Sequence, residues 1–202
     1  MEFLEVLRGR RMVRRYDGSP VGEEVLTAVL GAALRAPSAG NSQGRDLLVL
    51  RTGADRERFW SLTAPGPADR WLTGMRTAPV VVLLLADPGA YARRYAAADK
   101  PGPDRDAAGW EVSWPDVDTA MSGLLVLLAA VDAGLGACLF GVPSAAREAV
   151  LAAFGVPADR RLVAALTVGH PAADDASRPS RRHRRTVADT LHDGRFGAPW
   201  GG

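Results

Sequence analysis

An apolar segment near the middle of the chain, DVDTAMSGLLVLLAAVDAGLGA at 116–137, limits the possible folds more than any other feature. Its pattern predicts a helix over 116–134 whose centre, GLLVLLAAV, is apolar on every side. Such a helix lies either inside a large core or between two subunits, because none of its sides suits water. A chain of 202 residues builds one core of ordinary size. The sequence therefore predicts one domain that forms an obligate dimer through this helix.

The same segment does not predict a membrane protein. Its uninterrupted apolar part, between Ser122 and Asp132, is too short to span a bilayer. The first ten residues contain two glutamates and lack the apolar run of a secretory signal. The single cysteine, Cys138, excludes an intramolecular disulfide and suits a reducing compartment. We therefore expect a cytoplasmic protein, and its net charge of +2 is too small to indicate nucleic acid or membrane as a partner.

Helical and strand patterns alternate along the rest of the chain. Helices are predicted over 2–9, 19–40, 54–63 and 143–155, and strands over 46–50, 78–87, 136–140 and 160–169. In the helix at 19–40, the predicted buried face consists of Val25, Val29, Leu30, Ala33 and Leu34. Few strands combined with strong helices predict an α+β sandwich.

Two segments differ from this pattern. Residues 88–115 are rich in charges, prolines and aromatic residues, which predicts a lid or a substrate-binding loop. Residues 171–202 form a polar, arginine-rich C-terminal extension. Neither segment has the composition of a linker, so residues 1–202 are predicted to form a single domain.

Five arginines fall between Arg8 and Arg15, in the stretch LRGRRMVRRYDGSP. Guanidinium groups bind phosphate oxygens through paired hydrogen bonds and stay charged when partly buried, so this cluster is a candidate anion site. The alternative is a solvated basic end of a helix. Lys100 is the single lysine of the chain, and this bias toward arginine weakens the evidence for specific recognition.

Three further segments are candidates for a site, each with a simpler alternative. APSAGNSQG at 36–44 offers N–H groups, a hydroxyl and an amide to a planar ligand, or forms an ordinary turn. GLGACLFGVP at 134–143 lets a flat ring approach the backbone, or caps a helix with glycine. SRPSRRHRRTVADTLHDGRFG at 177–197 is a second basic cluster, or a solvated tail.

In this order and spacing, the four segments resemble the FMN-dependent nitroreductase family, in particular its short, single-domain members of actinobacterial type. The matching stretches are RRMVRRYDGSPV, AALRAPSAGNSQG, LLAAVDAGLGACLFG, and TVGHP followed by RPSRRHRRTVADTLHDGRF. The resemblance covers nearly the whole chain and is weakest at 52–77 and 88–115. It implies an α/β/α sandwich with a central mixed antiparallel sheet. It also implies a homodimer joined by long central helices, with two FMN sites at the interface.

The resemblance implies two groups of cofactor-binding residues. The phosphate and ribityl chain of FMN would be held by Arg10, Arg11, Arg14, the backbone of Met12, and the C-terminal residues Arg182 and Arg184. Of these, Arg14 would also reach the N1/O2 edge of the flavin. The flavin ring would contact Phe140 and Gly141, with a backbone N–H directed at N5, and, from the partner subunit, Pro37, Ser38, Ala39 and Asn41.

Three residues depart from the family pattern. Met12 replaces a frequent serine, so a hydroxyl contact is lost. Ser180 stands where many members have lysine, and Arg45 stands where tryptophan is common. Because of Arg45, the family pattern does not predict the packing or the substrate pocket near this residue.

The implied activity is hydride transfer from NAD(P)H through flavin N5 to an electron-poor acceptor such as a nitroaromatic or a quinone, in a ping-pong cycle. This chemistry needs no protein general acid. Since His170, His183 and His192 have no partner at triad or metal spacing, we predict neither a catalytic side chain nor a metal site.

Three other functions remain open at this point. The same fold could serve a biosynthetic flavin enzyme that dehydrogenates a specialised metabolite, or a flavin carrier without turnover. A nucleic-acid binder with two basic arms is a third possibility, although Asp17 and Asp189 lie close to the clusters. The sequence does not choose between NADH and NADPH or identify the acceptor.

Overall fold

The computed structural model describes residues 1–100, 109–173 and 184–201. Within these residues, four strands form one sheet in the order β1-β2-β4-β3, and each neighbouring pair is antiparallel. The strands are β1 Arg45–Leu50, β2 Val80–Ala86, β3 Gly136–Phe140 and β4 Arg161–Gly169. An isolated parallel bridge between Met12 and Ala137 lies at the outer edge of β3.

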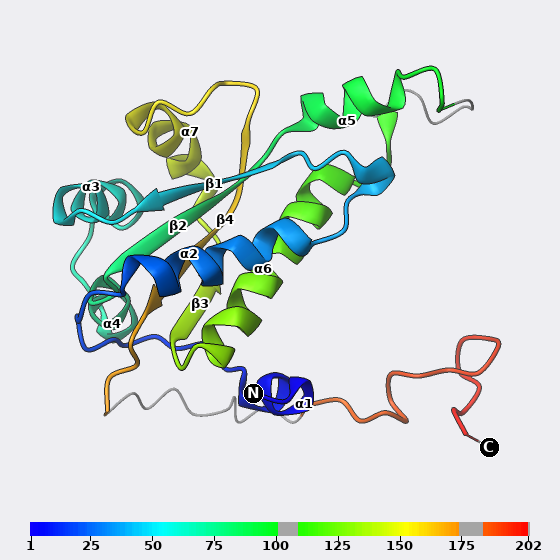
Figure 1. Cartoon of the computed structure of the whole chain (residues 1–202), viewed down its shortest axis with the longest axis horizontal. Coiled ribbons are helices and arrows are strands. Elements are labelled where there is room, and N and C mark those ends of the chain that lie inside the picture. The colour runs from blue at the N-terminus through cyan, green and yellow to red at the C-terminus, as the bar shows by residue number, and fades with distance from the viewer. Residues whose placement is uncertain (101–108, 174–183, 202) are drawn as a thin grey trace.

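The sheet is covered by helices on both faces, which confirms the predicted α/β/α sandwich (Figure 1). One face carries α2 Glu23–Gly31, the 3-10 turn η1 Ala32–Arg35 and α6 Trp114–Asp132. The other face carries α3 Gly53–Thr63, α4 Arg70–Arg76 and α7 Ser144–Ala153. The remaining elements are α1 Phe3–Gly9, the 3-10 turn η2 Ala39–Asn41 and α5 Pro88–Tyr95.

Strand β2 explains why two helical layers are needed. All seven of its residues are buried, and their side chains alternate between the two faces. Val80, Val82 and Leu84 join the core under α2 and α6, whereas Val81, Leu83 and Leu85 join the core under α3, α4 and α7. A strand that is apolar on both faces is stable only when both faces are covered.

Helix α6 is only half enclosed by the described part of its own chain. On its sheet side, an added Cβ at Gly123 would lie 2.6 Å from Leu84 and 2.9 Å from Leu139, so the helix rests directly on the sheet. The opposite side bears an apolar surface that is exposed or half-buried, here called the α6 stripe: Val117, Ala120, Met121, Leu124, Leu125, Leu128 and Val131. By length and composition α6 could cross a membrane, but its contacts with β2, β3 and β4 make it a core helix.

The structure differs from the sequence prediction in the helix expected at 19–40. The α-helix ends at Gly31 and continues only as the tighter turn η1. Val29 and Ala33 are buried as predicted, but Val25 and Leu34 are 43% and 70% exposed. Leu26 takes the core position instead.

Two helices were not predicted. Helix α4 lies in the weakly matched region, where the Asp69 side chain accepts a hydrogen bond from the N–H of Leu72. Helix α5 occupies the first part of the predicted lid, and Asp87 caps it by accepting from the N–H of Ala90. Pro88 at the start of α5 suits the first turn, where a missing N–H costs nothing.

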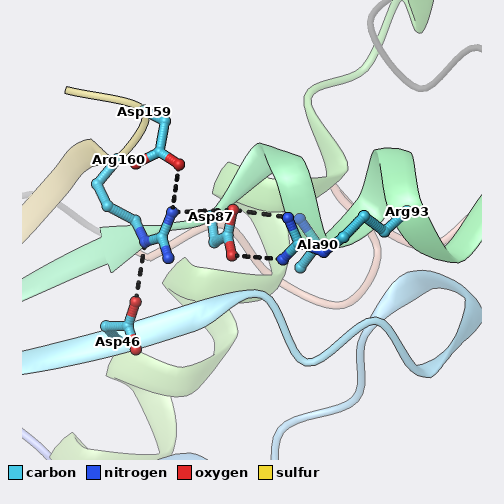
Figure 2. A network of polar contacts seen from close by, with 6 residues as sticks. All are labelled: Asp46, Asp87, Ala90, Arg93, Asp159 and Arg160. Atoms are coloured by element: carbon cyan, nitrogen blue, oxygen red, sulfur yellow. Dashed lines mark hydrogen bonds and ion pairs between the residues drawn. The ribbon is translucent and has the colours of Figure 1, made fainter. Parts of the chain in front are cut away.

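A network of charges fixes α5 to the end of the sheet (Figure 2). The Asp87 carboxylate is 3.1 Å from Arg160 and 3.2 Å from Arg93. Arg160 also pairs with Asp46 at the start of β1 and with Asp159. The network therefore joins β1, β2, α5 and the segment that leads into β4.

Candidate functional site

The arginine segment runs from the end of α1 along the outer edge of β3. The N–H of Val13 donates to the carbonyl of Ala137 at 3.0 Å, next to the Met12–Ala137 bridge. Val13 is buried, whereas Arg11 and Arg14 are exposed and Arg10 is half-buried. The backbone is thus tied to the sheet while the guanidinium groups remain near the surface.

Tyr16 anchors the far end of this segment. Its ring is buried, and its hydroxyl lies 2.7 Å from the carbonyl of Val13 and 2.8 Å from Thr167 Oγ1. Its N–H donates to Thr77 Oγ1 at 2.9 Å. On the other side, α4 approaches so closely at Gly74 that an added Cβ would clash with the carbonyl of Arg14.

The open edge of β3 offers N–H donors at every second residue. Because the carbonyl of Ala137 points outward to Val13, alternation directs the N–H of Leu139 outward as well. Continued one residue past the end of β3, the same alternation would direct the N–H of Gly141 outward. The N–H of Phe140 instead points toward β4, where Phe140 faces Ala165. An added Cβ at Gly141 would meet no described atom within 4 Å, so there is space beside this donor.

The side chain of Phe140 does not lie at this open edge. Its ring stacks on Trp60 at 5.6 Å and contacts Phe59 and Trp71 edge-on, in the layer of α3 and α4. The ring of Phe140 therefore packs in the layer of α3 and α4, while its neighbour Gly141 lies beside open space at the edge.

The segment 36–44 forms a shaped turn between η1 and β1. Three residues of the turn have positive φ angles: Gly40 at 61°, Asn41 at 56° and Gln43 at 52°. The N–H of Gln43 donates to Ser38 Oγ at 2.9 Å, and the N–H of Ala39 donates to Asp118 Oδ2 at 2.8 Å. Pro37 and Asn41 are exposed, whereas Ser38 and Ala39 are half-buried.

Within one chain, the arginine segment and the 36–44 turn lie at opposite ends of α6. Ala39 is bound to Asp118 near the start of the helix, and Gly9 approaches Val131 near its end. These two helical positions are about 20 Å apart at 1.5 Å per residue. A single chain therefore does not bring the 36–44 turn close to the arginine segment.

The predicted C-terminal residues are placed only in part. Arg182 lies outside the described residues. Arg184 is exposed and begins an arm that leads away from the body of the domain (Figure 1). Along 184–201 this arm exposes large apolar side chains, including Phe196 at 93% and Trp200 at 58%.

Two residues outside the predicted cofactor-binding set, Asp118 and Tyr91, pack behind the 36–44 turn. Asp118 is 1% exposed and accepts from Ala39, and the Tyr91 hydroxyl donates to the same oxygen at 2.7 Å. Burial and this hydrogen bond raise the pKa of Tyr91, so its hydroxyl stays protonated and remains a donor. In the sequence, Asp118 resembles an ordinary acidic residue near the start of a helix, so it gave no signal of this role.

The described residues contain no group of three or more His, Cys, Asp or Glu side chains that could hold a metal ion. What the site does offer is a row of guanidinium groups beside an open strand edge with outward N–H donors. This set of groups suits a ligand with a phosphate at one end and a flat, hydrogen-bonding ring at the other.

Comparisons with known proteins identify a family and a shared fold. The Nitroreductase family model matches residues 7–70 and 66–170. The NADH dehydrogenase of Thermus thermophilus is 33% identical over 183 residues, which span 82% of this chain and 84% of that protein. A protein of Desulfovibrio desulfuricans whose crystal structure contains FMN is 26% identical, with a TM-score of 0.72 and coverage of 97% and 98%. Nitroreductase CinD from Lactococcus lactis, in complex with nicotinic acid, shares the fold at 20% identity and a TM-score of 0.75, with coverage of 94% and 98%.

Proposed function

The chain belongs to the nitroreductase family of flavin oxidoreductases, and we propose that it binds FMN and passes a hydride from NAD(P)H to an electron-poor acceptor such as a nitroaromatic or a quinone. The observation that carries this proposal is the position of the arginine segment along the open edge of β3. Donor and acceptor use the same site in turn. A reducing, cytoplasmic location fits the free and buried Cys138.

The residues present fit FMN. Arg10 and Arg11 stand at the start of the strand edge and bind the phosphate, and Arg184 with Arg182 adds charge from the C-terminal extension. Arg14 binds the ribityl chain and the N1/O2 edge of the ring. Gly141 borders open space at the end of β3, so its N–H would be the donor to N5.

FMN, when bound, supplies the hydride chemistry at N5. The protein would hold the FMN in place and set the charges and hydrogen-bond donors around its ring. The positive charge of Arg14 would stabilise negative charge at the N1/O2 edge. The N–H of Gly141 fixes the orientation of the ring against β3.

A second copy of the chain completes the site. If two α6 stripes pack in antiparallel directions, the start of one helix lies beside the end of the other. The 36–44 turn of one chain then reaches the arginine segment of the other, which the single chain keeps about 20 Å away. Pro37, Ser38, Ala39 and Asn41 thus contact the flavin of the partner.

The first test is to purify the protein, record its visible spectrum, and release and identify any bound flavin. We expect FMN that survives desalting, and rapid NAD(P)H consumption when a nitroarene is added. Absence of flavin after reconstitution with FMN would overturn the proposal. Bound FMN without NAD(P)H turnover would identify a flavin carrier. Slow turnover with nitroarenes but reduction by another metabolite would point to a biosynthetic dehydrogenase.

The second test concerns the arginine segment. We predict that Arg11→Ala weakens FMN binding by about 1.5–3 kcal/mol, because one charged hydrogen-bond donor to phosphate is lost. Arg58→Ala, on the exposed face of α3, removes the same charge away from the site and should leave the affinity unchanged. Fluorescence titration of FMN checks both variants, and equal affinities for Arg11→Ala and the unmodified protein would exclude the arginine site.

A further inference from the structure

Asp118 is a buried carboxylate that the proposed hydride transfer does not use. It lies in the first part of α6 and is 1% exposed. Its Oδ2 accepts from the backbone N–H of Ala39 at 2.8 Å and from the hydroxyl of Tyr91 at 2.7 Å. A carboxylate removed from water is costly unless such donors compensate it. The two bonds therefore join α6, α5 and the 36–44 turn at one atom.

Helix α5 holds the same turn at a second point. Arg94 Nε donates to the carbonyl of Gly40 at 2.9 Å, and both terminal nitrogens of Arg94 pair with Asp99 at 2.8 Å. The ring of Tyr95 lies so close to Gly40 that an added Cβ would be 2.9 Å from it. Since the Asp87 network fixes the base of α5, the turn is held against a rigid element (Figure 2).

The turn needs such support because its backbone is strained. Asn41 and Gln43 are not glycine, yet both have positive φ angles. Each such residue costs energy and persists only where its surroundings fix it. The bond from Ala39 to Asp118 lies two residues before Asn41 and sets the direction of the chain as it enters this part of the turn.

We propose that Asp118 is a positioning residue for the flavin: it orients the 36–41 segment so that the segment fits the ring of the FMN bound by a second copy of the chain. The inference rests on the proposed function. Asp118 touches no reacting atom; it acts through Ala39. The negative charge matters because a charged acceptor binds an N–H about twice as strongly as a neutral one.

The test compares Asp118→Asn with Tyr91→Phe. Asp118→Asn keeps the shape of the side chain and removes its charge, so we expect the dissociation constant of FMN to rise about tenfold. Tyr91→Phe keeps the bond to Ala39 and should have a smaller effect. The matched control is Asp116→Asn, two positions earlier in α6, where the carboxylate instead binds Ser113 and Arg161.

Two readouts separate positioning from a general loss of stability. Hydrogen exchange of the FMN-free protein should increase at 37–43 in Asp118→Asn while β2 keeps its protection. The visible circular dichroism of bound FMN should change, because the ring's surroundings change.

Unchanged affinity, exchange and dichroism in Asp118→Asn would overturn the inference while FMN binding by the unmodified protein still stood. A lower melting temperature with unchanged affinity and dichroism would overturn it too. If the unmodified protein bound no FMN, the proposed function would fail first, and the exchange readout would still report whether Asp118 orders the turn.

Discussion

The Tyr16 hydroxyl serves the site without touching a ligand, because it holds the carbonyl of Val13 and Thr167 Oγ1 together beneath the arginine segment. We predict that Tyr16→Phe lowers the free energy of unfolding by about 1–2 kcal/mol, since a buried carbonyl loses its donor. Urea denaturation measures this loss. Tyr95→Phe is the matched control, because the Tyr95 hydroxyl has no hydrogen-bond partner among the described residues. Equal losses in both variants would show that Tyr16 is not the anchor.

The ion pair between Arg94 and Asp99 leads to a second prediction about single residues, which concerns the titration of the Asp99 carboxyl. The hydrogen bond from the Arg94 guanidinium lowers the pKa of Asp99 below its ordinary value. A carboxyl with a lowered pKa stabilises the fold above its unfolded pKa, and this contribution is lost as the pH falls through the folded pKa. We expect a carbon NMR titration of Asp99 with a midpoint below the usual range. In Arg94→Met the midpoint should rise toward that range; an unchanged midpoint would contradict the pairing.

At the scale of elements, Gly74 decides how closely α4 approaches the arginine segment. A Cβ at this position would clash with the carbonyl of Arg14, and the backbone has no simple way to move aside. We predict that Gly74→Ala lowers the free energy of unfolding by about 1–3 kcal/mol, the usual cost of overpacking. FMN affinity should fall as well, because the arginine segment shifts.

Gly31→Ala is the control for this variant. Gly31 is also helical, at the end of α2, but an added Cβ there meets no described atom within 4 Å. Alanine should be neutral or stabilising by up to about 1 kcal/mol, because it favours the helix. Thermal denaturation of both variants checks the contrast, and a loss of stability in Gly31→Ala equal to that in Gly74→Ala would contradict it.

Elements with a strong and uniform pattern were predictable from the sequence. The run APVVVLLLAD gave β2, and the apolar segment after Pro115 gave α6. Helix α5 was not predicted because its start signal, Asp87 followed by Pro88, also indicates the end of a strand. The helix at 19–40 was predicted too long, and its buried face was predicted only in part, because Val25 and Leu34 are apolar yet exposed.

At the scale of the whole molecule, some parts of the site could be identified from the sequence and others could not. The arginines were identifiable because they form a dense cluster, and the structure lays them along a strand edge. The role of Asp118 was not, because its partners Ala39 and Tyr91 are distant in sequence and meet only in the folded chain. The convergence of the two groups of site residues stays a prediction, since it needs a second chain.

The α6 stripe leads to the last prediction, which concerns assembly. The sequence left a choice between a core helix and an interface helix. The structure assigns the sheet side to the core, while the described residues leave the stripe exposed or half-buried. Leu124, 46% exposed, lies within the stripe. We predict that Leu124→Glu yields monomers in light scattering, because pairing the stripes would bury a carboxylate. FMN binding should be lost with the dimer.

Val25→Glu, at 43% exposure on α2, makes the same change outside the stripe and should remain a dimer that binds FMN. A Leu124→Glu protein that stays dimeric would place the interface elsewhere, and a monomer that still binds FMN tightly would show that one chain suffices for the site.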